Sequence, residues 1–202
     1  EAARSGMMTA RQEVERQITT DPYFSVTLEP YVPECPGRTV GRMARAAGDA
    51  GVGPMAAVAG AIAWAGVETM VEAGAAFGLI DNGGDIALVS DREIRIGIFA
   101  GESPLSGRFA FLLPPQDEIL GICTSSATVG PSISLGIADA VTVFSPDVAV
   151  ADAWATAICN QIARDDTSIL DTLPGTGVLV VLALIDDTVI RWGDLPRMVR
   201  AR

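Results

Sequence analysis

The spacing of hydrophobic positions along the chain predicts four helices. Apolar side chains recur at helical intervals over about residues 3–19. A second helix is expected over residues 39–50, with Thr39 as its N-cap. Residues 55–72 are apolar on nearly every face, which is typical of a buried helix. A fourth helix, also apolar, is expected over about residues 148–163.

Short apolar runs, separated by Gly, Asp and Pro, predict strands. They lie at residues 77–80, 86–90, 94–100, 109–113, 121–124 and 140–144. A final hairpin is expected from residues 178–185 and 188–192. The proline-rich stretch 25–38 should be an extended connector. This order predicts an α+β fold, in which helices pack on a mainly antiparallel or mixed sheet.

The length and composition favour one core. Of 202 residues, 49% are hydrophobic, so we expect residues 1–202 to form a single domain. Because the chain opens at Glu1 rather than Met, we expect some upstream residues to be missing from this sequence.

The charge balance changes which partners are expected. A net charge of −11 would repel a phosphate backbone, so nucleic-acid binding is disfavoured. An acidic cleft could hold a divalent cation, although a dispersed acidic surface more often serves solubility. Two uncharged windows, 50–67 and 119–138, approach the length of a membrane span, but Gly, Pro and hydroxyl residues interrupt them. We therefore expect no membrane association and a cytoplasmic location.

Several side chains on which catalysis often depends are missing. The chain has no His, and all fourteen basic residues are Arg. This excludes Ser-His-Asp and Cys-His systems, imidazole metal ligands and lysine chemistry. General acid and base work would fall mainly to carboxylates or metal-bound water. Cys35, Cys123 and Cys159 are odd in number and widely spaced, so no disulfide is expected.

Four segments combine glycine, small hydroxyl side chains and carboxylates. The first, residues 51–57 (GVGPMAA), leads into the apolar helix at 55–72. Backbone N–H groups at such a helix start can bind a phosphate, with Gly53 close to the ligand. The alternative is a tight turn with close helix packing.

The second segment lies between two expected strands. It reads Asp81-Asn82-Gly83-Gly84-Asp85, and Asn-Gly between apolar runs is a strong hairpin signal. As a binding segment, the paired glycines would let the backbone approach a ligand, and Asp85 would face it.

The third segment, residues 123–132 (CTSSATVGPS), is dense in hydroxyl groups. Thr124, Ser125 and Ser126 could donate to phosphoryl or carbonyl oxygens. A loop whose hydroxyls satisfy its own backbone would look the same.

The fourth segment is ADAWATA, residues 151–157. Asp152 and Thr156 are four residues apart and lie on one helical face. An oxygen-only pair suits a hard cation such as Mg²⁺ rather than zinc. The alternative is an intrahelical hydrogen bond from Thr156. For a cation site, we expect both residues to share a cleft with Asp85 or the 124–128 loop.

Taken together, these segments resemble a known family. The strings VGPMAAVAGAIA, NGGDI, CTSSATVG, ADAVTV and ADAWATAICN, in this order, are similar to an uncharacterised prokaryotic family of ApbE-like proteins. The resemblance covers about residues 23–192. It implies an ApbE-like, T-fold-like sheet with packed helices, related to the FAD:protein FMN transferases.

The resemblance also implies roles for individual residues. Asp152 and Thr156 match the transferases' magnesium ligands, and Gly83, Gly84 and Asp85 match a turn near the flavin nucleotide. Thr124 and Ser125 match the transferases' TSG-like segment. The transferases' histidine-containing stretch has no counterpart here, and Pro54 or Met55 stands where they carry Lys.

Two functions follow as hypotheses. One is a magnesium-dependent activity on FAD, either FMN transfer or pyrophosphate cleavage. The other is a non-catalytic protein that binds a nucleotide-like small molecule or assists assembly. Helices rich in Gly and Ala could also pack subunits in a homo-oligomer. Beyond these groups, no catalytic residue can be assigned.

Overall fold

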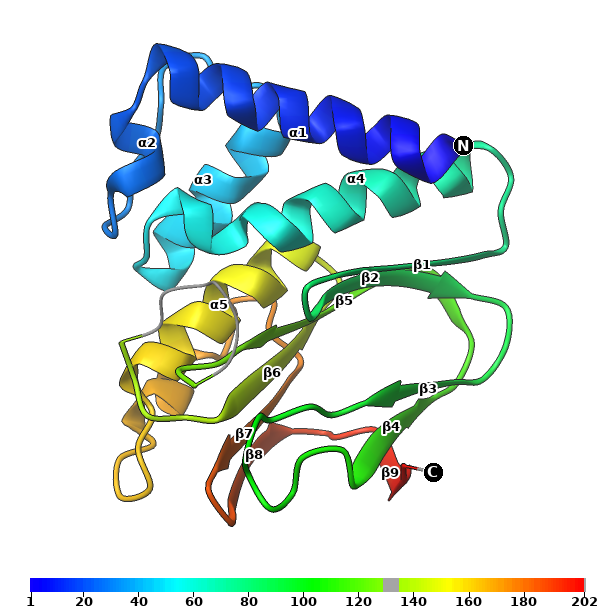
Figure 1. Ribbon diagram of the computed structural model, residues 1–202, viewed down its shortest axis with the longest axis vertical. Helices are drawn as coiled ribbons and strands as arrows, with labels where there is room; N and C mark the ends of the chain where they lie inside the picture. Colours follow the sequence, from blue (N-terminus) through cyan, green and yellow to red (C-terminus); the bar gives the residue numbers. More distant parts are fainter. Residues whose placement is uncertain (129–134, 202) are drawn as a thin grey trace.

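The chain folds into three layers, in which helices, a large sheet and a small sheet lie one on another (Figure 1). The computed structural model describes residues 1–128 and 135–201. The helical layer contains α1 (Ala2–Thr20), α2 (Tyr23–Val26), α3 (Arg38–Ala50), η1 (Pro54–Ala57), α4 (Val58–Glu72), α5 (Val148–Gln161) and η2 (Ser168–Thr172).

Every strand pairing in the described residues is antiparallel. The large sheet has the order β1-β2-β5-β6-β7-β8. Its strands are β1 (Phe77–Asn82), β2 (Asp85–Ser90), β5 (Gln116–Ser125), β6 (Ala140–Ser145), β7 (Val180–Ile185) and β8 (Thr188–Gly193). The small sheet has the order β3-β4-β9, from β3 (Ile94–Gly97), β4 (Phe109–Leu113) and β9 (Arg197–Arg200).

The large sheet is buried on both faces. One hydrophobic cluster lies between it and the helices and is built mainly from Ala and Val. A second cluster lies between the two sheets and is richer in Ile, Leu and Phe. All residues of β6 and β7 are buried for this reason, and so these strands are apolar without alternation.

The α+β prediction is confirmed, and of the two alternatives given for the sheet the described residues show antiparallel pairing. Three details differ from the prediction. The connector expected at 25–38 begins inside the short helix α2. The strand β9 was not predicted, because its sequence RMVR has no apolar run. Thr39 is not the N-cap of α3: Gly37 is, and Glu13 of α1 accepts the Val40 N–H at 2.8 Å.

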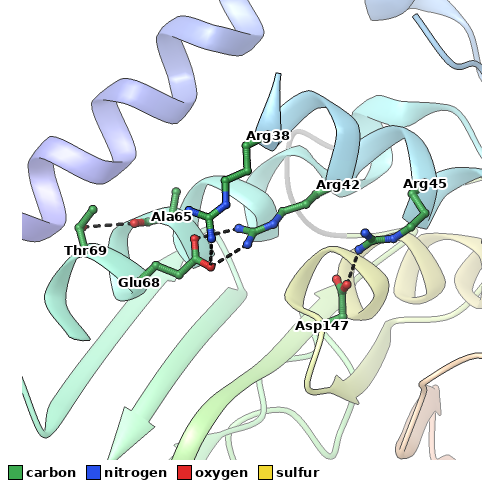
Figure 2. Close-up of polar contacts among 7 residues, drawn as sticks. All are labelled: Arg38, Arg42, Arg45, Ala65, Glu68, Thr69 and Asp147. Carbon is green, nitrogen blue, oxygen red and sulfur yellow. Dashed lines mark hydrogen bonds and ion pairs between the residues drawn. The ribbon is translucent and has the colours of Figure 1, made fainter. Parts of the chain in front are cut away.

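Arginines on α3 connect this helix to α4 and α5 (Figure 2). The guanidinium of Arg42 pairs with Glu68 at 2.7 Å and lies 3.8 Å from the centroid of the Trp64 ring. Arg45 pairs with Asp147, whose carboxylate also accepts the Val150 N–H and so caps α5. The start of α5 is thereby fixed against α3.

One glycine allows α4 and α5 to approach closely. A Cβ at Gly60 would lie 2.9 Å from the Cβ of Asp152 and 3.0 Å from the carbonyl oxygen of Val148. By length and composition alone, Pro54–Glu72 could cross a membrane, but such a stretch is also common in the core helix of a folded domain. Here α4 packs between α1 and the large sheet (Figure 1).

We expect Gly60→Ala to lower the free energy of unfolding by about 1–3 kcal/mol, because the added methyl group overpacks the α4–α5 contact. The matched control is Gly48→Ala on α3, where a Cβ would meet nothing within 4 Å. That change should stabilise the protein by about 0.5–1 kcal/mol through helix propensity. Urea unfolding of both variants measures the difference, and equal effects would contradict the packing argument.

A second pair of variants tests the arginine contacts. Arg42→Ala should lower the free energy of unfolding by about 1–3 kcal/mol, since it removes a half-buried ion pair and a cation–π contact. Arg38 pairs with the same Glu68 at 2.9 Å, but 65% of its side chain is exposed. Arg38→Ala should therefore cost under about 0.5 kcal/mol. Thermal unfolding that ranks Arg38→Ala as the more damaging change would refute this assignment.

Candidate functional site

A pocket of about 800 Å³ opens where the helical layer, the β1–β2 turn and the end of β3 meet. Segments far apart in sequence line it, including residues 51–53, 55–56, 58–59, 81–86 and 96–99. Thr124, Ser126, Thr142, Thr156 and Asn160 add polar groups from β5, β6, α5 and the 126–128 segment. No Arg lies among the described lining residues, although Asp81 and Asp85 do.

The β1–β2 turn fits both interpretations of its sequence. Asn82 pairs with Asp85, so Gly83 and Gly84 form a two-residue turn with φ values of 75° and 106°. Positive φ at both positions favours glycine. Asp81 accepts the Gly84 N–H at 2.9 Å, and all five residues line the pocket.

The start of α4 offers less to a phosphate than its sequence indicates. The Asp152 carboxylate accepts the Gly60 N–H at 2.8 Å. Gly53 lines the pocket, but a Cβ there would lie 2.0 Å from the carbonyl oxygen of Thr27. Gly53 is therefore needed for close packing, and the Gly60 N–H in the first turn of α4 bonds to a side chain of this protein.

The two candidate cation ligands of the fourth segment, Asp152 and Thr156, differ in their access to the pocket. Thr156 is half-buried and lines the pocket. Asp152, one helical turn away, is only 7% exposed and lies outside the set of lining residues. Asp85 is half-buried in the pocket wall, where its Oδ1 accepts the Thr124 N–H at 3.2 Å. Asp85 therefore lines the pocket, whereas Asp152 is buried beside it without lining it.

Burial disfavours the ionised forms of Asp85 and Asp152. Desolvation raises the pKa of Asp85 to about 7, against the lowering effect of hydrogen bonds from the Thr124 N–H and the Cys123 thiol. Desolvation also raises the pKa of Asp152 well above its usual value, and the charge of Asp85 raises it further. Burial and both carboxylates raise the pKa of the Cys123 thiol. Cys123 is therefore a neutral thiol rather than a nucleophile.

The hydroxyl segment is only partly in the site. Thr124 lines the pocket and shares a 2.9 Å hydrogen bond with Thr142 of the neighbouring strand. Ser126 also lines it, and its hydroxyl accepts the Thr128 N–H of its own loop. Ser125 is buried and does not line the pocket. Residues 129–132 of this segment lie outside the described residues.

Sequence reasoning missed Thr142 and Phe99 as lining residues, and it missed the contact that Asn82 makes with α4. Thr142 faces Thr124 only because β5 and β6 pair in this register. Asn82 donates from Nδ2 to the Ala59 carbonyl at 3.0 Å, which connects the β1–β2 turn to α4. Phe99 lines the pocket while 67% exposed, and no local pattern marks it.

A cation would find oxygen donors here, but not a complete set. Among residues 1–128 and 135–201, no group of three or more His, Cys, Asp or Glu side chains could hold a metal ion. Asp85 and Thr156, which line the pocket, and Asp152, which is buried and does not line it, supply oxygen atoms only. This donor set fits Mg²⁺, which usually keeps several waters and binds substrate phosphates.

Comparisons with known proteins agree on one family. A family model described as AbpE bacteria matches residues 1–174. The UPF0280 protein of Methanoculleus marisnigri is 77% identical over 202 residues, which are all of this chain and 83% of the relative. That of Methanosphaerula palustris is 60% identical over 201 residues, which cover 100% of this chain and 85% of the relative.

Solved structures give weaker likenesses. The apo form of the flavinyl transferase ApbE from Pseudomonas stutzeri has a TM-score of 0.48 at 15% identity, over 70% of this chain and 48% of that chain. A histidine-to-glycine mutant of the flavin transferase ApbE from Vibrio cholerae has a TM-score of 0.48 at 14% identity, over 92% of this chain and 72% of that chain.

The raised pKa of Asp85 predicts a pH-dependent stability. Its pKa is about 7 in the folded protein, against 3.8 for the ordinary group, so the folded state binds the proton more tightly. The stability that this proton contributes is lost as the pH rises from about 4 to about 7. The variant Asp85→Asn keeps an acceptor for the Thr124 N–H and has no charge to desolvate. At about pH 8 it should be more stable than the wild type by about 2 kcal/mol.

Urea unfolding of both proteins between about pH 5 and pH 8 measures this gap. The gap should widen with rising pH and level off above the folded-state pKa. A gap that is constant over the whole range would show that Asp85 is not desolvated.

Proposed function

The chain belongs to the AbpE bacteria family, and on that premise we propose that it is a magnesium-dependent enzyme acting on the pyrophosphate of FAD, by FMN transfer or by hydrolysis. One observation carries the proposal: the buried Asp152 carboxylate lies close enough to Asp85, in the pocket wall, for the charge of Asp85 to oppose its ionisation, and no arginine is among the pocket's described lining residues. A cation would relieve this repulsion and also attract phosphate groups.

The pocket suits such a ligand in size and chemistry. Its volume of about 800 Å³ is within the range of about 300–1,000 Å³ that small-molecule sites occupy. Asp152 and Thr156 would hold Mg²⁺, with Asp85 near them. When bound, Mg²⁺ would neutralise charge on phosphoryl oxygens. The glycine turn at 83–84 would let a ligand approach the backbone closely.

Asp85 is the group in this pocket best suited to exchange a proton. A general acid or base works best when its pKa lies near the operating pH, and burial raises the pKa of Asp85 to about 7. In FAD hydrolysis, water would attack one phosphorus atom and the bridging P–O bond would break. The products would be FMN and AMP, and Asp85 would take the proton that the water loses.

A non-catalytic binding protein is the second candidate. The observation that favours it is the absence of every His and Lys from the sequence. Incubation of the protein with FAD and Mg²⁺ separates the two candidates. Release of FMN and AMP, or FMN attached to an added acceptor protein, supports the enzyme. Tight binding of intact FAD without turnover supports the binding protein.

Calorimetry of FAD or ADP binding, with and without Mg²⁺, tests the cation site itself. Mg²⁺ should tighten nucleotide binding to the wild type by about tenfold or more, and Asp152→Ala should abolish that gain. The control is Asp49→Asn, which removes one charge from an exposed position on α3. If all three proteins respond equally to Mg²⁺, Asp152 does not hold the cation.

A further inference from the structure

The mouth of the pocket exposes large apolar side chains from three distant segments. Leu28, Phe99 and Leu135 all line the pocket and are 63%, 67% and 70% exposed. Deeper in the pocket, the wall continues through Ile98, which is 5% exposed, and Phe111, which is 1% exposed. The pocket therefore offers apolar surface as well as carboxylates and hydroxyls.

Phe99 is the aromatic ring in this wall that is free to stack on a ligand. Phe111, the other described aromatic lining residue, packs edge to face against Phe144 in the core, with ring centroids 4.9 Å apart and an interplanar angle of 86°. No described side chain covers the Phe99 ring in a comparable way, since most of its surface is exposed.

The chemistry of the mouth fits a planar ring better than a protein partner. Three exposed side chains are few against the roughly 20–30 residues that each partner contributes to a stable protein interface. An aromatic face instead favours offset stacking on a flat heteroaromatic system, which also covers apolar surface. The carboxylates and hydroxyls that would bind the polar part of such a ligand line the same cavity.

We propose that Phe99 is a specificity-determining residue, which stacks on a heteroaromatic ring of the nucleotide while the phosphates lie on the Asp85 side. The inference rests on the proposed function, because it assumes a flavin nucleotide in this pocket. The ring is either the isoalloxazine or the adenine of FAD. Both have the same stacking chemistry, and FMN and ADP carry them separately.

The experiment measures dissociation constants of FAD, FMN and ADP with Mg²⁺ for the wild type and four variants. Phe99→Ala should weaken FAD binding about tenfold, and should weaken only one of FMN and ADP to a similar extent. Phe99→Tyr keeps the ring and should stay within about twofold of the wild type. Phe99→Leu keeps apolar area without a ring and should resemble Phe99→Ala.

Phe77→Ala is the matched control. Phe77 is 40% exposed, lies under Arg92 at 5.2 Å and does not line the pocket, so its removal should leave all three constants unchanged. An unchanged FAD constant in Phe99→Ala, equal losses for FMN and ADP, or the same loss in Phe77→Ala would overturn the stacking role alone. If the wild type binds none of the three nucleotides, the proposed function fails together with it.

Discussion

The hydrogen bond from the Gly60 N–H to the Asp152 carboxylate is the contact on which the site depends. It lets a side chain of α5 cap the start of α4, across 92 residues of sequence, and it requires a glycine at the point of contact. The same turn of α4 offers the Ala59 carbonyl to Asn82, which ties down the β1–β2 turn. One helical turn thereby places both Asp152 and the hairpin turn that carries Asp85.

The burial of Asp85 and Asp152 near the pocket lowers the stability of the folded protein when these carboxylates are ionised. Two backbone N–H groups lower the pKa of Asp152, but desolvation outweighs them and the pKa stays raised. Asp85 is in the same condition, with burial outweighing its hydrogen bonds. Elsewhere in the structure, carboxylates near α3 and α4 pair with arginine, as Glu68 and Asp147 do (Figure 2). Buried carboxylates without such partners are typical of functional sites rather than of the fold's own support.

Hydrophobic periodicity predicted the helices and most strands, because an element that is buried on one or two faces has a characteristic spacing of apolar residues. It could not predict contacts made between elements, such as the Glu13 cap on α3 or the pairing of β9. In the candidate site, Asp85, Thr124 and Thr156 line the pocket, whereas Ser125 does not. The sequence could not mark Phe99 as a site residue, because only the folded structure shows that this exposed ring lines the pocket. Homo-oligomer formation and a cytoplasmic location stay predictions.

The small sheet has a part in the site as well as in the core. Its strands cover the second face of the large sheet, and β3 continues into the pocket wall through Gly97, Ile98 and Phe99. The β1–β2 turn, β5, β6 and α5 supply carboxylates, glycines and hydroxyls to the lining, whereas the small sheet and the segment after β3 supply Ile96, Ile98, Phe99 and Phe111. On the proposed stacking role, a change at Phe99 would alter ring binding, while Asp152, which α5 carries and the Gly60 N–H of α4 holds, would keep its place.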